Sequence, residues 1–116
     1  MSRKKKVDLI TIRVHKFFPD RGYGFGFCEN GQSYYFKMDN GREPLPSTAG
    51  LPTLLSASHG GIVTKPQAGD FLRILPRGTP WGLQAMMWMF EDVYWDAFHA
   101  SRKLLTVEGL SAKHGG

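Results

Sequence analysis

The chain of 116 residues contains a single cysteine, Cys28, so it cannot form an internal disulfide bond and does not require an oxidising compartment. Its four histidines, at positions 15, 59, 99 and 114, are scattered and lack the spacing of a metal site. No apolar run approaches the roughly 20 residues that a membrane-spanning helix needs. These absences predict a soluble, cytoplasmic protein of one domain that uses no metal, cofactor or membrane.

Motifs of the common enzyme classes are also missing. No Ser/His/Asp, Cys/His or paired-carboxylate arrangement stands out, and no glycine-rich loop precedes the expected helix. The glycines at positions 22, 24 and 26 alternate with aromatic residues, which is a strand pattern and not a nucleotide-binding loop. We therefore do not expect an enzyme.

Positive charge is unevenly distributed along the chain. The formal net charge is +5, and the run Arg3-Lys4-Lys5-Lys6 supplies four of these charges. No sufficiently long apolar stretch follows this run, so it does not resemble a secretory signal. Residues 1–7 are predicted to form a basic flexible arm, which either neutralises nucleic-acid phosphates or serves only as a solubilising tail.

The most informative stretch is residues 21–27, Arg-Gly-Tyr-Gly-Phe-Gly-Phe. Because successive side chains of a β-strand point to opposite faces, Tyr23, Phe25 and Phe27 would share one face and the glycines the other. The bare glycine face would let another backbone come close. The ring face, with Arg21 at its edge, would be a platform on which bases of single-stranded nucleic acid can stack. The alternative is a glycine-rich hairpin whose rings pack into an ordinary core.

Alternation and turn signals predict a mainly β fold, with strands over 8–18, 22–28, 32–38, 71–75 and 83–90. In the first strand, Ile10, Ile12 and Val14 would share one face; in the third, the face of Tyr34, Phe36 and Met38 is the better core candidate. Residues 8–90 would form a five-stranded antiparallel barrel of the OB type, with a proline-rich insertion over 39–66 that holds a short hairpin or a helical turn. Residues 91–105 have the spacing of an amphipathic helix that caps the barrel, and 106–116 would form a loose tail.

Several motifs, taken in order, resemble those of the cold-shock domain family. Lys16-Phe17-Phe18-Pro19 is similar to the family's Lys-Trp-Phe-Asn, and residues 21–26 are similar to its Lys-Gly-(Phe/Tyr)-Gly-Phe-Ile. Residues 34–38 resemble its third strand, 68–71 resemble the start of its fourth strand, and 82–88 resemble its closing strand. The resemblance covers residues 8–38 and 66–90; the insertion and the C-terminal helix lie outside the family pattern. It implies an OB-type barrel whose nucleic-acid face comprises Lys16, Phe17, Phe18, Arg21, Tyr23, Phe25, Tyr35 and Lys37, to which the strand alternation adds Phe27.

These features lead to two functional hypotheses. The first is a protein that binds single-stranded RNA or DNA with little sequence specificity, and that keeps strands unpaired as a nucleic-acid chaperone does. The second is a protein-interaction barrel that docks a protein partner through the aromatic face, the insertion 39–66 or the C-terminal helix. A steep loss of affinity with rising salt would favour the first.

Overall fold

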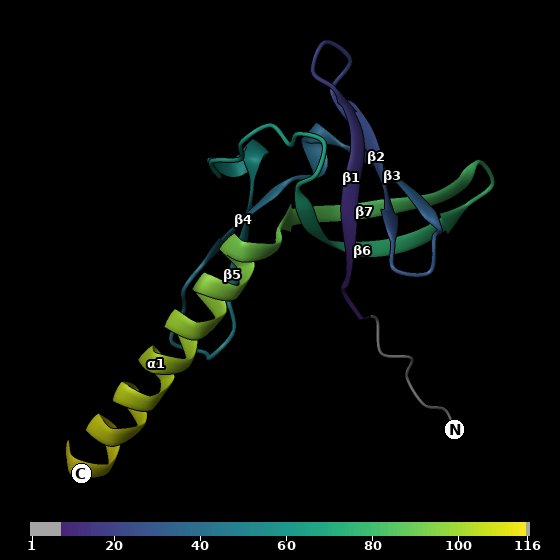
Figure 1. The fold of residues 1–116 in the computed structure, drawn as a ribbon. Coiled ribbons are helices and arrows are strands. Elements are labelled where there is room, and N and C mark those ends of the chain that lie inside the picture. The colour runs from purple at the N-terminus through teal and green to yellow at the C-terminus, as the bar shows by residue number, and fades with distance from the viewer. Residues whose placement is uncertain (1–7, 116) are drawn as a thin grey trace.

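The computed structural model describes residues 8–115, with side chains up to residue 106, so the predicted basic arm over 1–7 lies outside the described residues. Five strands form a closed barrel in the order β1-β2-β3-β7-β6, with β6 pairing back onto β1 (Figure 1). They are β1 (Ile10–Phe18), β2 (Tyr23–Cys28), β3 (Ser33–Lys37), β6 (Phe71–Thr79) and β7 (Gly82–Phe90). The prediction of a mainly β fold with a five-stranded barrel and a C-terminal helix is confirmed.

One detail of the predicted barrel is wrong, because the sheet is mixed and not purely antiparallel. β3 and β7 run parallel and meet through the pair Tyr35 and Gln84, whereas the other four neighbouring pairs are antiparallel. A closed ring of five strands cannot alternate in direction throughout, since an odd number leaves one pair of neighbours pointing the same way. Closure of the barrel therefore requires the parallel pair.

The glycine face of β2 lies against the backbone of β1. A Cβ atom on Gly24 would lie 2.5 Å from the carbonyl oxygen of Lys16, and one on Gly26 would lie 2.4 Å from that of Arg13. The register of β1 against β2 shifts between Val14 and Lys16, which marks a β-bulge and tightens the local twist. The expectation that the bare face admits a second backbone is confirmed, and the two glycines allow the barrel to coil tightly.

The variant Gly26→Ala is expected to destabilise the protein by roughly 1–3 kcal/mol, because the added methyl group meets backbone that cannot rotate away. The matched control is Gly78→Ala on β6, where nothing lies within 4 Å of the new Cβ and the substitution should change stability by less than about 0.5 kcal/mol. Urea unfolding followed by circular dichroism measures both. Equal midpoints for the two variants would show that β1 does not constrain β2.

The core of the barrel is apolar and is supplied by the inward faces of its strands. Its buried members are Ile12, Val14, Tyr34, Phe36, Leu72, Ile74, Ala85 and Trp88, with Ile10 and Met38 packed against them. The core candidates of the third strand are therefore confirmed, and the shared face of Ile10, Ile12 and Val14 is the inward face of β1. Trp88 is fully buried and donates its indole N–H to the carbonyl oxygen of Lys37 at 2.7 Å, which ties β7 to the end of β3.

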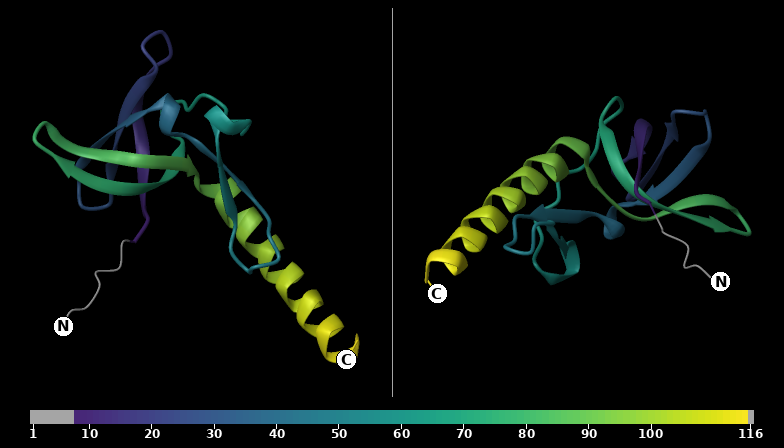
Figure 2. Two further views of the ribbon diagram at one scale, coloured as in Figure 1. Left: turned by 180° about the vertical axis from the view of Figure 1, so that it is seen from behind. Right: turned by 90° about the horizontal axis from the view of Figure 1, so that it is seen from below.

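The insertion between β3 and β6 contains both of the predicted elements. A short 3₁₀ turn (Met38–Asn40) leads into the two-stranded hairpin of β4 (Arg42–Leu45) and β5 (Thr53–Ser56), and a second 3₁₀ turn follows (Ala57–His59). The hairpin lies beside the C-terminal helix, as seen from behind in Figure 2. The backbone N–H of Ser47 donates to the buried Ser101 hydroxyl at 3.0 Å, so the insertion is fixed to the helix by a specific contact.

The C-terminal helix, α1, spans Glu91–Gly115 and begins where it was predicted to begin. The predicted end at residue 105 and the loose tail are wrong, because the helix continues for ten more residues. It does not cap the barrel either: it leaves the end of β7 and projects away, with the β4–β5 hairpin along its side (Figures 1 and 2). The helix and the insertion therefore pack on each other. Within the described residues, no helix is long and apolar enough to cross a membrane.

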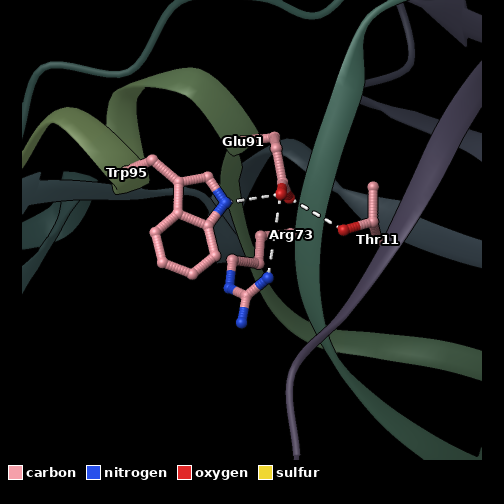
Figure 3. Close-up of polar contacts among 4 residues, drawn as sticks. All are labelled: Thr11, Arg73, Glu91 and Trp95. Atoms are coloured by element: carbon pink, nitrogen blue, oxygen red, sulfur yellow. Dashed lines mark hydrogen bonds and ion pairs between the residues drawn. The ribbon is translucent and has the colours of Figure 1, made fainter. Parts of the chain in front are cut away.

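A small polar cluster joins the first turn of α1 to the barrel (Figure 3). One carboxylate oxygen of Glu91 accepts a hydrogen bond from Thr11 on β1 at 2.8 Å, and the other accepts one from the indole N–H of Trp95 at 2.6 Å. Arg73 on β6 lies 3.7 Å from the same carboxylate, with its guanidinium 4.8 Å from the ring of Trp95 and 4.9 Å from that of Tyr94. The cluster fixes the direction in which the helix leaves the barrel.

Candidate functional site

The outer face of β1, β2 and β3 carries most of the predicted site residues. Tyr23, Phe25 and Phe27 point outward because the glycines between them point inward against β1. Tyr35 is the cross-strand neighbour of Phe25 on β3, so the rings of the two strands lie side by side. We call the outward rings of Phe18, Tyr23, Phe25, Phe27 and Tyr35 the platform.

The platform rings contact one another in two groups. In the first, the ring centres of Phe18 and Tyr23 are 5.2 Å apart, and those of Tyr23 and Tyr35 are 5.3 Å apart. In the second, Phe25 and Phe27 lie edge to face at 6.0 Å. This mutual packing leaves most of the rings half-buried and Phe27 40% exposed, so each ring is held in place and still has surface open to solvent.

His15 belongs to the second group and was not predicted as a site residue. Its ring lies 5.3 Å from that of Phe25 and 5.5 Å from that of Phe27. His15 occupies the bulge of β1, and both it and the following Lys16 are exposed, which a regular strand would not allow. The alternation breaks at residues 16–18, which indicates a bulge or a strong twist from the sequence alone, but this break does not show that His15 meets the rings of β2.

The predicted cations lie around the platform. The ammonium nitrogen of Lys16 is 5.3 Å from the ring centre of Phe18, and Arg21 lies within 3.4 Å of the Tyr23 hydroxyl, to which its Nη1 donates. Lys37 is exposed and pairs across the strands with Tyr23. Strands β1, β2 and β3 contain no aspartate or glutamate. The rings are therefore surrounded by positive charge that no carboxylate on these strands offsets.

Phe17 is the exception among the predicted site residues. Its ring packs against the core and stacks nearly parallel to Phe36, with the ring centres 6.0 Å apart and the planes at 6°. The bulge places Lys16 outward, so Phe17 turns inward and Phe18 turns outward again. The structure thus brings Lys16, Phe18, Arg21, Tyr23, Phe25, Phe27, Tyr35 and Lys37 together on one face and places Phe17 beneath it.

We looked for metal ligands on this face and for known proteins that share it. No group of three or more histidine, cysteine, aspartate or glutamate side chains in the described part of the chain could hold a metal ion. Comparisons with protein-family models, curated proteins and solved structures gave no match. The chemistry of the face is that of stacking rings beside cations.

Proposed function

We propose that this protein binds single-stranded RNA or DNA on the platform, in the manner of a cold-shock domain, and acts as a nucleic-acid chaperone. The observation that carries the proposal is the coincidence on one face of five outward rings with Lys16 and Lys37, on strands that carry no acidic side chain, and with Arg21 in the turn between β1 and β2. Stacked bases gain roughly 1–3 kcal/mol each on such rings, and the cations meet the phosphates between them.

The preference for unpaired strands follows from the rings. A base can stack on Phe25 or Tyr23 only when its face is free, and the bases of a duplex are already stacked on one another. Ring stacking tolerates every base, because each base has a π face, so sequence specificity on the platform is low. A protein that holds strands in this form opposes their pairing, which is the action of a chaperone.

The direct test is titration of a fluorescent pyrimidine-rich single strand, in ribose and deoxyribose forms, beside the matching duplex. We expect tighter binding of the single strands, with log Kd changing linearly with log salt concentration at a slope of about 0.7 for each phosphate neutralised. Salt-independent binding, or no binding of either strand, would contradict the proposal. A protein partner for the platform would then become the better hypothesis.

The variant Lys37→Ala is expected to weaken binding at low salt and to flatten the salt slope by about 0.7, the contribution of one phosphate contact. Lys103→Ala is the control, because Lys103 is equally exposed but lies on α1, away from the platform. Fluorescence anisotropy at several salt concentrations measures both slopes. Equal slopes for the two variants would mean that Lys37 does not meet a phosphate.

A further inference from the structure

A second row of outward side chains continues the platform onto β6. Arg13 on β1 pairs across the strands with Phe27 on β2 and with Phe71 on β6. Phe27 and Phe71 are 40% and 53% exposed. The guanidinium of Arg13 lies 5.7 Å from the ring centre of Phe71. The row therefore presents a cation between two exposed apolar rings, and neither Arg13 nor Phe71 is among the predicted site residues.

A cleft of about 1300 Å³ lies beside this row. Its lining includes Arg13, Phe27 and Phe71, together with residues 29, 30 and 32 of the turn between β2 and β3. The volume exceeds the roughly 300–1,000 Å³ typical of small-molecule pockets. A cleft that is this large and open, at the end of the platform, is better suited to one nucleotide of a bound strand than to a free small molecule.

The turn residues supply hydrogen-bond donors to the cleft. The side-chain oxygen of Asn30 already accepts from the Cys28 thiol at 2.7 Å and from the backbone N–H of Gln32 at 3.3 Å. The side-chain oxygen of Gln32 accepts from the Tyr34 hydroxyl at 3.4 Å. Burial raises the pKa of Tyr34, and the nearby Cys28 raises it further, so this hydroxyl keeps its proton. The amide N–H groups of Asn30 and Gln32 are then the ones left for a ligand.

Glu29 adds a carboxylate to the same cleft. Among the described side chains, Arg73–Glu91 is the ion pair that forms, so Arg13 and Glu29 line one cleft without a direct ion pair between them. A carboxylate at this position disfavours a phosphate and accepts hydrogen bonds from a base. A guanidinium and a carboxylate together match guanine, whose O6 and N7 accept from arginine and whose N–H groups donate.

Resting on the proposed function, we propose that the cleft beside Arg13 is a base subsite at the end of the platform, and that it prefers guanine. The two rings, Phe27 and Phe71, supply apolar contact for the base. The guanidinium of Arg13 donates to O6 and N7 of guanine, and the carboxylate of Glu29 accepts hydrogen bonds from the guanine N–H groups. The platform would then bind strands of any sequence, while one position along the strand is selected.

The experiment uses a pyrimidine strand of about 12 nucleotides, within the usual 4–16 nucleotides per OB barrel. A single guanine is placed at each position in turn, in ribose and deoxyribose forms, and affinities are measured by fluorescence anisotropy. We expect guanine to tighten binding by roughly 5- to 150-fold at one position and to have little effect elsewhere. Adenine in the same position is the matched base control.

The variant Arg13→Lys separates the subsite from general electrostatics, because lysine keeps the charge but lacks the planar fork. We expect the guanine preference to be lost while affinity for the all-pyrimidine strand stays within about twofold. A flat guanine scan, or a preference that survives in Arg13→Lys, would overturn the subsite and leave the platform intact. Failure of every strand to bind would overturn the proposed function and the subsite with it.

Discussion

Replacement of Trp88 by alanine is expected to destabilise the protein by about 3–5 kcal/mol, a large part of the roughly 5–15 kcal/mol that stabilises a typical domain. Trp88 is fully buried, its ring centre lies 5.6 Å from those of Phe36 and Phe90, and its indole N–H donates to the carbonyl oxygen of Lys37. The variant would leave a cavity and also an unpaired carbonyl. Urea unfolding followed by circular dichroism at the β-sheet signal measures the loss.

Trp81→Ala is the matched control, because Trp81 lies at the tip of the same β6–β7 hairpin and is 92% exposed. Its removal should change stability by less than about 0.5 kcal/mol. The two variants delete the same side chain from one hairpin, so the difference between them reports the burial of Trp88 together with its hydrogen bond to Lys37. Similar unfolding midpoints would show that the core is not organised around Trp88.

Replacement of Phe25 by alanine is expected to reduce affinity for a pyrimidine-rich single strand by roughly 5- to 150-fold, equivalent to the 1–3 kcal/mol of one stacked base. Phe25 lies at the centre of the platform, in contact with His15 and Phe27 and next to Tyr35 across the strands. Since its ring is only half-buried, the stability loss should be well below that of Trp88→Ala. Anisotropy titration and thermal unfolding of the same preparation measure the two effects.

Val93→Ala serves as the binding control, because Val93 is an exposed apolar residue on α1 and should leave affinity unchanged. A Phe25→Ala protein that fails to fold would place the ring in the core and remove it from the site. A folded Phe25→Ala protein with full affinity would contradict stacking on the platform. In that case the exposed rings would be better explained by a protein partner.

Local sequence pattern predicted the elements of the barrel because each is determined by neighbouring residues. The alternation of Tyr23, Phe25 and Phe27 with glycines predicted both faces of β2, and the start of α1 followed from Glu91 and Asp92 in its first turn. The expected turn between Pro76 and Gly82 was too long. β6 continues through an irregularity at Leu75 and Pro76 and ends at Thr79, because an edge bulge accommodates the proline.

Features that depend on contacts between distant residues could not be predicted in this way. The broken alternation at residues 16–18 indicates a bulge, but the inward turn of Phe17 is visible only in the pairing of β1 with β2. Arg13 and Phe71 are 58 positions apart in the sequence and become neighbours only when β6 pairs with β1. The contact between the insertion and α1 likewise depends on the path of two segments that have no shared local motif.

The parallel junction between β3 and β7 has fewer backbone pairs than any other junction between neighbouring strands of the barrel. β3 and β7 share the single pair Tyr35 and Gln84. Beyond the end of β3, an isolated parallel bridge joins Gly41 to Trp88, and the indole N–H of Trp88 donates to the carbonyl oxygen of Lys37. Local opening of the barrel would therefore begin with separation of β3 from β7, next to Tyr35. A ligand that contacts Tyr35 on β3 together with Gln84 on β7 would bridge this junction and favour the closed barrel, so occupancy of the outer face and closure of the interior would be thermodynamically linked.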